Sequence, residues 1–158
     1  MTRTPENETH PQAPVLSDLD GTLLPSAEGI VLLHEMQHAR FGGGSGVRDF
    51  PLLEGAAARG LMRLLYEDPD DLIGAICAIG EGVIRSHPMV DGNKRAGFAV
   101  ITVGLALNGL SLEMSPRDAA QAVVDFAGGK LSSEAFRDLI RDHVTVERSA
   151  NRSPWPSP

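Results

Sequence analysis

The sequence has little cysteine, few aromatic side chains and no excess of positive charge. Cys77 is the only cysteine among 158 residues, so no internal disulfide can form, and this count is compatible with a reducing compartment. Aromatic residues make up 4% of the chain, which argues against a surface that stacks nucleic-acid bases. The formal net charge is −7, so any bound phosphate must be held by a local cluster of donors.

Long apolar runs are also absent. The longest, from Gly97 to Leu107, is too short to cross a bilayer, and residues 1–14 lack the apolar stretch of a secretory signal. We therefore expect a soluble, cytoplasmic protein. Apolar residues still make up 42% of the chain, enough for one domain with its own core. We predict a single domain over residues 15–147, with disordered segments at 1–14 and 148–158 that are rich in proline, polar and charged residues.

The hydrophobic pattern of the central part is helical. Helices are predicted from Ala27 to about Phe41, from about Leu52 to Arg59, from about Asp70 to Arg85, from Asn93 to Leu107, from Pro116 towards Phe126, and from Ser132 or Ser133 towards His143. The fourth of these is apolar nearly all round and is expected in the core. Short extended pieces are expected near Val15 and Leu112. The predicted fold class is all-α, a compact bundle of about six helices.

Three motifs suggest different chemistries, and the first is Asp18-Leu19-Asp20-Gly21-Thr22. It resembles the nucleophile loop of haloacid-dehalogenase-like phosphatases, in which two carboxylates act beside a magnesium ion. That loop follows a buried strand of a parallel sheet, and this sequence predicts helices. A polar loop leading into the first helix is the favoured interpretation.

The second motif is His34-Glu35-Met36-Gln37-His38, an H-E-x-x-H pattern on a predicted helix. Its spacing places both imidazoles on one face, where they can bind zinc with the glutamate as a base, as in zinc proteases. No G-x-x-H follows to supply a third ligand, and no edge strand is apparent for a peptide substrate. An amphipathic helix with two half-buried histidines is the competing interpretation.

The third motif runs from His87 to Arg95 and reads HPMVDGNKR. His87 precedes a predicted helix and can take a proton from an attacking hydroxyl. Gly92 lets the backbone come close to a phosphate. The N–H groups of Gly92, Asn93 and Lys94 open the helix, where free donors form an anion site.

Charged residues complete the third motif. Lys94 and Arg95 add positive charge, and the forked guanidinium of Arg95 can bind two phosphate oxygens. Asp91 offers a hard oxygen to magnesium, and Arg85 is expected to reach the same phosphates. A polar turn explains the Asp-Gly-Asn sequence but does not require His87, Lys94 and Arg95 together. The motif therefore favours transfer of a phosphate-containing group.

This segment closely resembles the signature of the Fic/Doc family, H-x-F-x-[D/E]-G-N-[G/K]-R. The resemblance covers about residues 15–145. Further similarity to the Doc (death-on-curing) toxins lies at Leu33-His34, Arg40 to Gly43, Gly46 to Asp49, Leu52 to Glu54, Ala58-Arg59, Asn108-Gly109 and Gly128 to Ser132. The family includes His34 as an ordinary feature of its first helix, which weakens the case for zinc.

The resemblance implies a compact all-helical fold and a role for each residue of the motif. His87 would be the general base and Asp91 would hold Mg²⁺, while Lys94 and Arg95 complete the catalytic set. The phosphates of the donor, ATP, would be held by Arg85, Gly92, Asn93, Lys94 and Arg95.

Two departures from the family pattern affect the predicted reaction. Most Fic enzymes, which transfer AMP, have glycine at the position of Lys94 and a second arginine at that of Phe98. Doc toxins share the lysine and lack that arginine, and in them the terminal phosphate is thought to face the target. We therefore expect protein phosphorylation, with AMP transfer as the alternative. Met89 stands where the family usually has phenylalanine, and we expect it to pack under the loop.

The resemblance also implies partners. For Doc toxins the target is elongation factor Tu, and its phosphorylation blocks translation. A Phd-like antitoxin would fold a C-terminal helix onto the toxin, and no direct contact with nucleic acid or membrane is expected. Arg48 and Glu54 are expected at the rim that meets the target. A Fic/Doc fold that has lost activity and only binds a partner is the second functional class.

Overall fold

A computed structural model describes residues 14–147 of the chain. This part contains six helices and two antiparallel strand pairs, which confirms the predicted helical bundle with short extended pieces. The elements are β1 (Leu16–Leu19), β2 (Thr22–Pro25), α1 (Ala27–Phe41), α2 (Phe50–Tyr66), α3 (Leu72–Ser86), α4 (Asn93–Leu107), β3 (Leu110–Leu112), α5 (Pro116–Ala127), α6 (Ser133–Asp142) and β4 (Val144–Val146). The predicted segments at 1–14 and 148–158 lie almost wholly outside the described residues.

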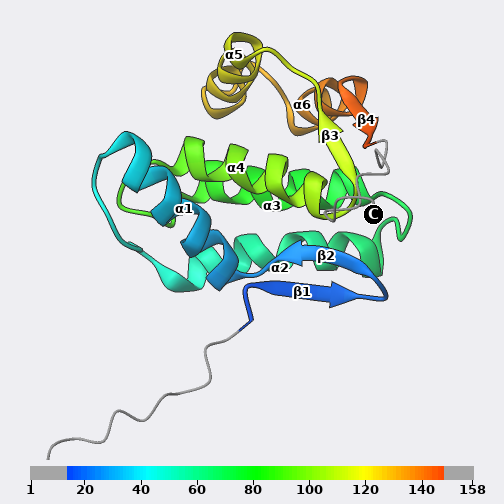
Figure 1. Cartoon of the computed structure of the whole chain (residues 1–158), viewed down its shortest axis with the longest axis horizontal. Helices are drawn as coiled ribbons and strands as arrows, with labels where there is room; N and C mark the ends of the chain where they lie inside the picture. Colours follow the sequence, from blue (N-terminus) through cyan, green and yellow to red (C-terminus); the bar gives the residue numbers. More distant parts are fainter. Residues whose placement is uncertain (1–13, 148–158) are drawn as a thin grey trace, which may run out of the picture.

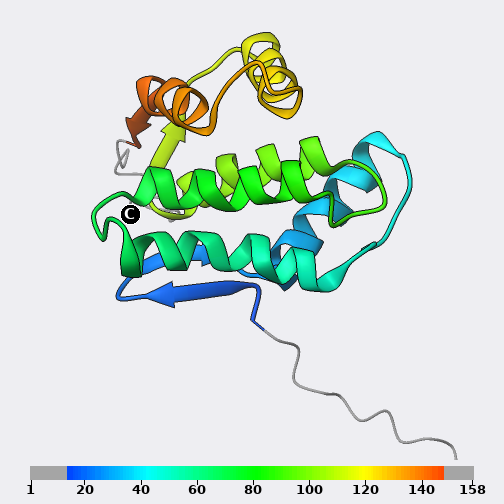
Figure 2. The ribbon, with the colours of Figure 1, turned by 180° about the vertical axis from the view of Figure 1, so that it is seen from behind.

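Helices α3 and α4 form the centre of the molecule (Figures 1 and 2). Helix α2 and the β1–β2 pair lie on one side of them, and α5 and α6 lie on the other. All residues from Gly74 to Ile84 of α3 are buried, because helices cover this segment on several sides. The expectation that α4 lies in the core is confirmed for one face, although Val103 and Leu107 are exposed.

Glycines bring the two central helices into backbone contact. A Cβ atom on Gly80 would lie 2.7 Å from the carbonyl oxygen of Gly97, and a Cβ atom on Gly97 would lie 2.7 Å from that of Gly80. Both distances are shorter than a van der Waals contact, so neither position accepts a side chain without a shift of the helices. The two glycines therefore allow the backbones of α3 and α4 to lie close together.

The phosphatase-like motif forms a hairpin turn. β1 pairs with β2 in an antiparallel register, and Asp20 and Gly21 connect them with φ angles of 50° and 90°. Asp-Gly is a preferred pair for such a two-residue turn. The Asp18 carboxylate accepts a hydrogen bond from the Gly21 N–H at 2.8 Å. No parallel sheet is present among the described residues, so the structure supports the local turn and not the phosphatase.

Most helix starts follow from their caps. Ser26, Asp49, Asp71, Ser115 and Ser132 each accept a hydrogen bond from an N–H group in the first turn of the following helix.

One predicted helix was too short. Helix α2 continues to Tyr66, because Gly60 is a packing position and does not end the helix. A Cβ atom there would lie 2.6 Å from Cδ1 of Ile79, so the absence of a side chain allows α2 to approach α3.

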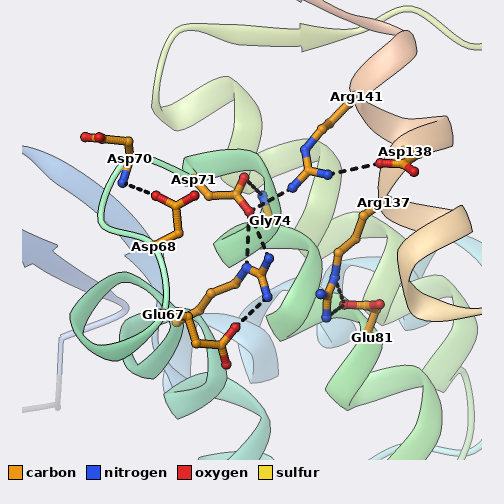
Figure 3. A network of polar contacts seen from close by, with 10 residues as sticks. Glu67, Asp68, Asp70, Asp71, Gly74, Glu81, Arg137, Asp138 and Arg141 are labelled. Carbon is orange, nitrogen blue, oxygen red and sulfur yellow. Dashed lines mark hydrogen bonds and ion pairs between the residues drawn. The ribbon is translucent and has the colours of Figure 1, made fainter.

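A polar network ties α2 and α6 to the start of α3 (Figure 3). The Asp71 carboxylate caps the Gly74 N–H and accepts hydrogen bonds from Arg63 and Arg141. Deeper in the protein, Arg137 of α6 pairs at 2.9 Å with Glu81, whose side chain is fully buried. These contacts hold α6 against the central helices. Among the described residues, no helix is long and apolar enough to span a membrane.

Candidate active site

The loop between α3 and α4 reverses the chain through two left-handed residues. His87, with φ 51° and ψ 55°, ends α3, and Gly92, with φ 74° and ψ 22°, precedes α4. Gly92 makes no side-chain cap, in contrast to the Ser and Asp caps of the other described helices. The first N–H groups of α4 therefore lack a capping side chain and have no partner within the helix. The sequence predicted free N–H donors at Gly92, Asn93 and Lys94, but the Gly92 N–H donates to Oδ1 of Asp91, so the candidate anion site begins at Asn93.

The side chain of Asn93 holds the loop from inside. Its Oδ1 accepts a hydrogen bond from the Met89 N–H at 2.9 Å, and its Nδ2 donates to the Met89 carbonyl at 3.1 Å. Both residues are buried, and Met89 packs under the loop as expected. The sequence did not predict this pairing. It leaves the backbone N–H of Asn93, and not its side chain, to face a ligand at the start of α4.

Asp91 is exposed on the loop. Its Oδ1 accepts from the Gly92 N–H at 2.8 Å and its Oδ2 accepts from the Gly44 N–H at 3.2 Å. These two N–H groups, with the positive charge of Arg95, keep the pKa of the Asp91 carboxyl below its usual range. The carboxylate is therefore ionised at neutral pH.

His34 binds the same loop from α1. Its Nε2 lies 2.6 Å from the carbonyl oxygen of Asp91, and because a carbonyl can only accept, Nε2 carries the proton. The His34 side chain is buried, and its hydrogen bond to Asp91 helps to hold the loop in place. Within residues 14–147, no group of three or more His, Cys, Asp or Glu side chains is arranged to hold a metal. The geometry thus supports a positioning role for His34 in place of the zinc-protease interpretation.

A pocket of about 790 Å³ lies between this loop and α5. One wall is polar and comes from the loop and the start of α4. The other is largely apolar and comes from Phe98 and α5. The lining residues are His87, Val90, Asp91, Gly92, Asn93, Lys94, Arg95, Phe98, Pro116, Ala119, Ala120, Val123 and Val124. All the residues predicted from the signature therefore meet in one cavity.

Arg85 is the predicted site residue that does not line this pocket. Its guanidinium carbon lies 4.4 Å from the ring centre of Phe126, and the residue borders a separate groove between α2 and α3. Arg95 has a comparable contact, with its guanidinium carbon 5.0 Å from the ring centre of Phe41. Aromatic faces attract guanidinium groups, so these contacts restrict both side chains.

The segment between α1 and α2 pairs with the loop, which sequence reasoning missed. Val47 and Met89 form an antiparallel bridge, and the Val90 N–H donates to the Gly46 carbonyl at 3.1 Å. The available signal was the glycine-rich stretch from Gly42 to Gly46, which directly follows the predicted helix end at Phe41. Gly43 has a φ of 99°, and a Cβ atom there would lie 2.7 Å from Oδ2 of Asp91. Glycine is therefore required for this close approach.

Comparison with protein families finds a match that contains this loop. A model of the Fic/DOC family matches residues 24–105, more than half of the chain, from the end of β2 through most of α4. The chain belongs to the Fic/DOC family. The match includes the whole loop and the segment that pairs with it.

Two relatives carry more specific names. The chain is 34% identical over 108 residues to Toxin Doc of Mycolicibacterium smegmatis, a match that covers 68% of this chain and 78% of that protein. It is 29% identical over 116 residues to Protein kinase doc of Escherichia phage P1, covering 73% of this chain and 91% of that protein. This Fic/DOC protein therefore matches most of the length of both.

Proposed function

We propose that this Fic/DOC protein is a Doc-like toxin that transfers a phosphoryl group from a nucleotide to a hydroxyl of a protein. The observation that carries the proposal is that His87, Lys94, Arg95 and the uncapped start of α4 line a single pocket. The names Toxin Doc and Protein kinase doc of its relatives support the same activity.

The proposed roles follow from position and charge. The phosphates of ATP bind at the start of α4, where backbone N–H groups and the exposed side chains of Lys94 and Arg95 are available. His87 is exposed and lines the same pocket, and it takes the proton from the attacking hydroxyl. The apolar wall from Phe98 and α5 suits the uncharged part of the nucleotide.

Asp91 fits a role in binding Mg²⁺. Mg²⁺ in nucleotide sites is commonly held by one or two carboxylates together with the substrate phosphates. Asp91 provides one ionised carboxylate beside the proposed phosphate site, and both of its oxygens are oriented by backbone N–H groups. When bound there, the ion neutralises charge on the phosphates.

Lys94 and Phe98 favour phosphoryl transfer over AMP transfer. Phe98 adds an apolar surface to the pocket at the position where AMP-transferring relatives are expected to have a phosphate-binding arginine. Lys94 adds a charge at the start of α4. Together they favour a nucleotide whose terminal phosphate faces the protein substrate.

The proposed partners follow from the proposed toxin function. A toxin requires an inhibitor in the cell that makes it, and we infer a Phd-like antitoxin for this role. Elongation factor Tu is the proposed substrate, by the resemblance to Doc, and the cytoplasm is the proposed location because that factor acts there.

A two-label assay tests the reaction. The purified chain, Mg²⁺ and a bacterial extract are incubated with ATP labelled at either the γ or the α phosphate. Transfer of γ label to a protein of the size of elongation factor Tu supports the proposal. Transfer of α label indicates AMP transfer and contradicts the interpretation of Lys94 and Phe98. If neither label is transferred while the chain still arrests growth through binding alone, the chain is an inactive Fic/Doc binding module.

A further inference from the structure

Arg48 contacts the backbone at the end of α3, although its side chain is exposed. Its Nε donates to the carbonyl oxygen of His87 at 2.9 Å, and its Nη2 donates to the same oxygen at 2.5 Å. Nη2 also donates to the carbonyl of Ser86 at 3.2 Å. A guanidinium group can make this forked contact because its donors lie in one plane.

The backbone that Arg48 contacts needs support. His87 is one of two non-glycine residues with positive φ among residues 14–147, and the other, Asp20, lies in the β1–β2 turn. A residue with a Cβ atom adopts this conformation only at a cost in energy. The last carbonyls of α3 also lack partners within the helix and carry partial negative charge, which a guanidinium group complements.

The backbone of the same segment completes the attachment. The N–H groups of Arg48 and Asp49 donate to the Pro88 carbonyl at 2.7 and 3.0 Å. Three successive carbonyls, those of Ser86, His87 and Pro88, are thus held by two adjacent residues between α1 and α2. No hydrogen bond to the His87 ring occurs within the described part of the chain, so its direction depends on the backbone.

We propose that Arg48 is a positioning residue that fixes the left-handed backbone of His87 and so aims its imidazole into the pocket. The expected effect of Arg48 on the reaction rate rests on the proposed function. The claim that Arg48 fixes the backbone of His87 does not. Arg48 is not among the residues that line the pocket, so it contributes to the reaction through His87 and not through contact with the nucleotide.

The kinetic test compares Arg48→Ala with Arg117→Ala, a control at an exposed position on α5. In the γ-label assay, Arg48→Ala should lower kcat on the order of 100-fold, because misplacing a reacting group by about 1 Å has that effect. The KM for ATP should change less than about twofold. Free guanidinium ion should restore part of the rate, and Arg48→Lys should keep more of it than Arg48→Ala.

Two kinetic outcomes would overturn the proposal: an unchanged kcat, or a raised KM for ATP at constant kcat.

A spectroscopic test needs no substrate. The backbone Cα and Cβ chemical shifts of His87 in the full chain report its left-handed conformation. They should move towards ordinary values in Arg48→Ala and stay unchanged in Arg117→Ala, while the shifts of α3 and α4 are preserved. Left-handed shifts retained in Arg48→Ala would overturn the proposal, even if the wild-type chain transfers no label. If Arg48→Ala does not fold, Arg48→Gln answers the same question.

Discussion

At the scale of single residues, three side chains hold the backbone of the candidate active-site loop. His34 donates to the carbonyl of Asp91, Arg48 donates to that of His87, and Asn93 pairs with both polar groups of Met89. His34 comes from α1, Arg48 from the segment between α1 and α2, and Asn93 from the start of α4. The loop is therefore fixed by polar contacts to its backbone.

Replacing Asn93 with alanine tests this view. The change leaves the buried N–H and carbonyl of Met89 without partners, and we expect the free energy of unfolding to fall by about 2–4 kcal/mol. Urea unfolding measures it. Gln121→Ala is the control, since that exposed side chain pairs only with Asp125 on the surface, and it should change stability by less than about 0.5 kcal/mol. Equal effects of the two changes would contradict the account.

Cys77 is expected to be chemically inert in the folded protein. Burial raises the pKa of its thiol to about 12, and the residue has no exposed surface. Because the thiolate is the reactive form, iodoacetamide should modify Cys77 at neutral pH only after unfolding in urea. Mass spectrometry of the treated chain measures the modified fraction. Rapid labelling of the native protein would show that α3 is not buried as described.

At the scale of helices, the site depends on how closely α3 and α4 approach. Gly97→Ala places a methyl group 2.5 Å from Cγ1 of Ile84 and 2.7 Å from the carbonyl of Gly80. We expect a loss of about 1–3 kcal/mol, since added atoms in a filled core force shifts of the backbone. Gly55→Ala on α2 is the matched change, because no atom lies within 4 Å of its Cβ position. It should stabilise the protein by about 0.5–1 kcal/mol. Thermal and urea unfolding measure both.

The helices were predictable to the extent that local caps and periodicity set them. Helix α1 and helix α4 have the predicted bounds, because Ser26 caps one and the loop motif precedes the other. The end of α2 was not predicted, because the reason for a glycine at position 60 is its close contact with Ile79, a residue of another helix. The pairing of Gly46 with the loop is likewise a long-range contact, which no local pattern encodes.

The candidate site was predictable in composition and less so in geometry. The signature identifies the candidate residues, and the free N–H groups at the start of a helix predict an anion site there. The position of Arg85 over the Phe126 ring depends on how α5 packs against α3, which the sequence pattern does not specify. The roles of Arg48 and Asn93 depend on contacts between segments in the same way.

At the scale of the whole molecule, the network around Asp71 connects α2, α3 and α6 (Figure 3). Partial burial raises the pKa of Asp71, but hydrogen bonds from the Gly74 N–H and from Arg141 and Arg63 lower it more, and the net shift is downward. A carboxyl whose folded-state pKa is depressed stabilises the fold above its ordinary pKa. This contribution is lost as the pH falls through the folded-state pKa.

Acid stability should therefore depend on Asp71. Asp71→Asn keeps an oxygen for the Gly74 cap but loses the charge, and we expect it to lower stability by about 2 kcal/mol at neutral pH. The difference from wild type should shrink as the pH falls below about 3.8, the ordinary value for this group. Urea unfolding between neutral pH and strong acid measures the trend. Asp118→Asn, at an exposed position, is the control, and a difference that grew in acid would contradict the account.

The central claim is that His87 acts as a base beside phosphates held at the start of α4. The most direct measurement is the rate of γ-phosphoryl transfer by His87→Ala, together with its affinity for ATP from calorimetry. We predict a loss of rate of about 10²–10⁴-fold, as is typical when a general base is removed, with an affinity close to that of wild type. His143→Ala, on a residue that does not line the pocket, should keep the rate. Transfer by His87→Ala at the wild-type rate would contradict the claim.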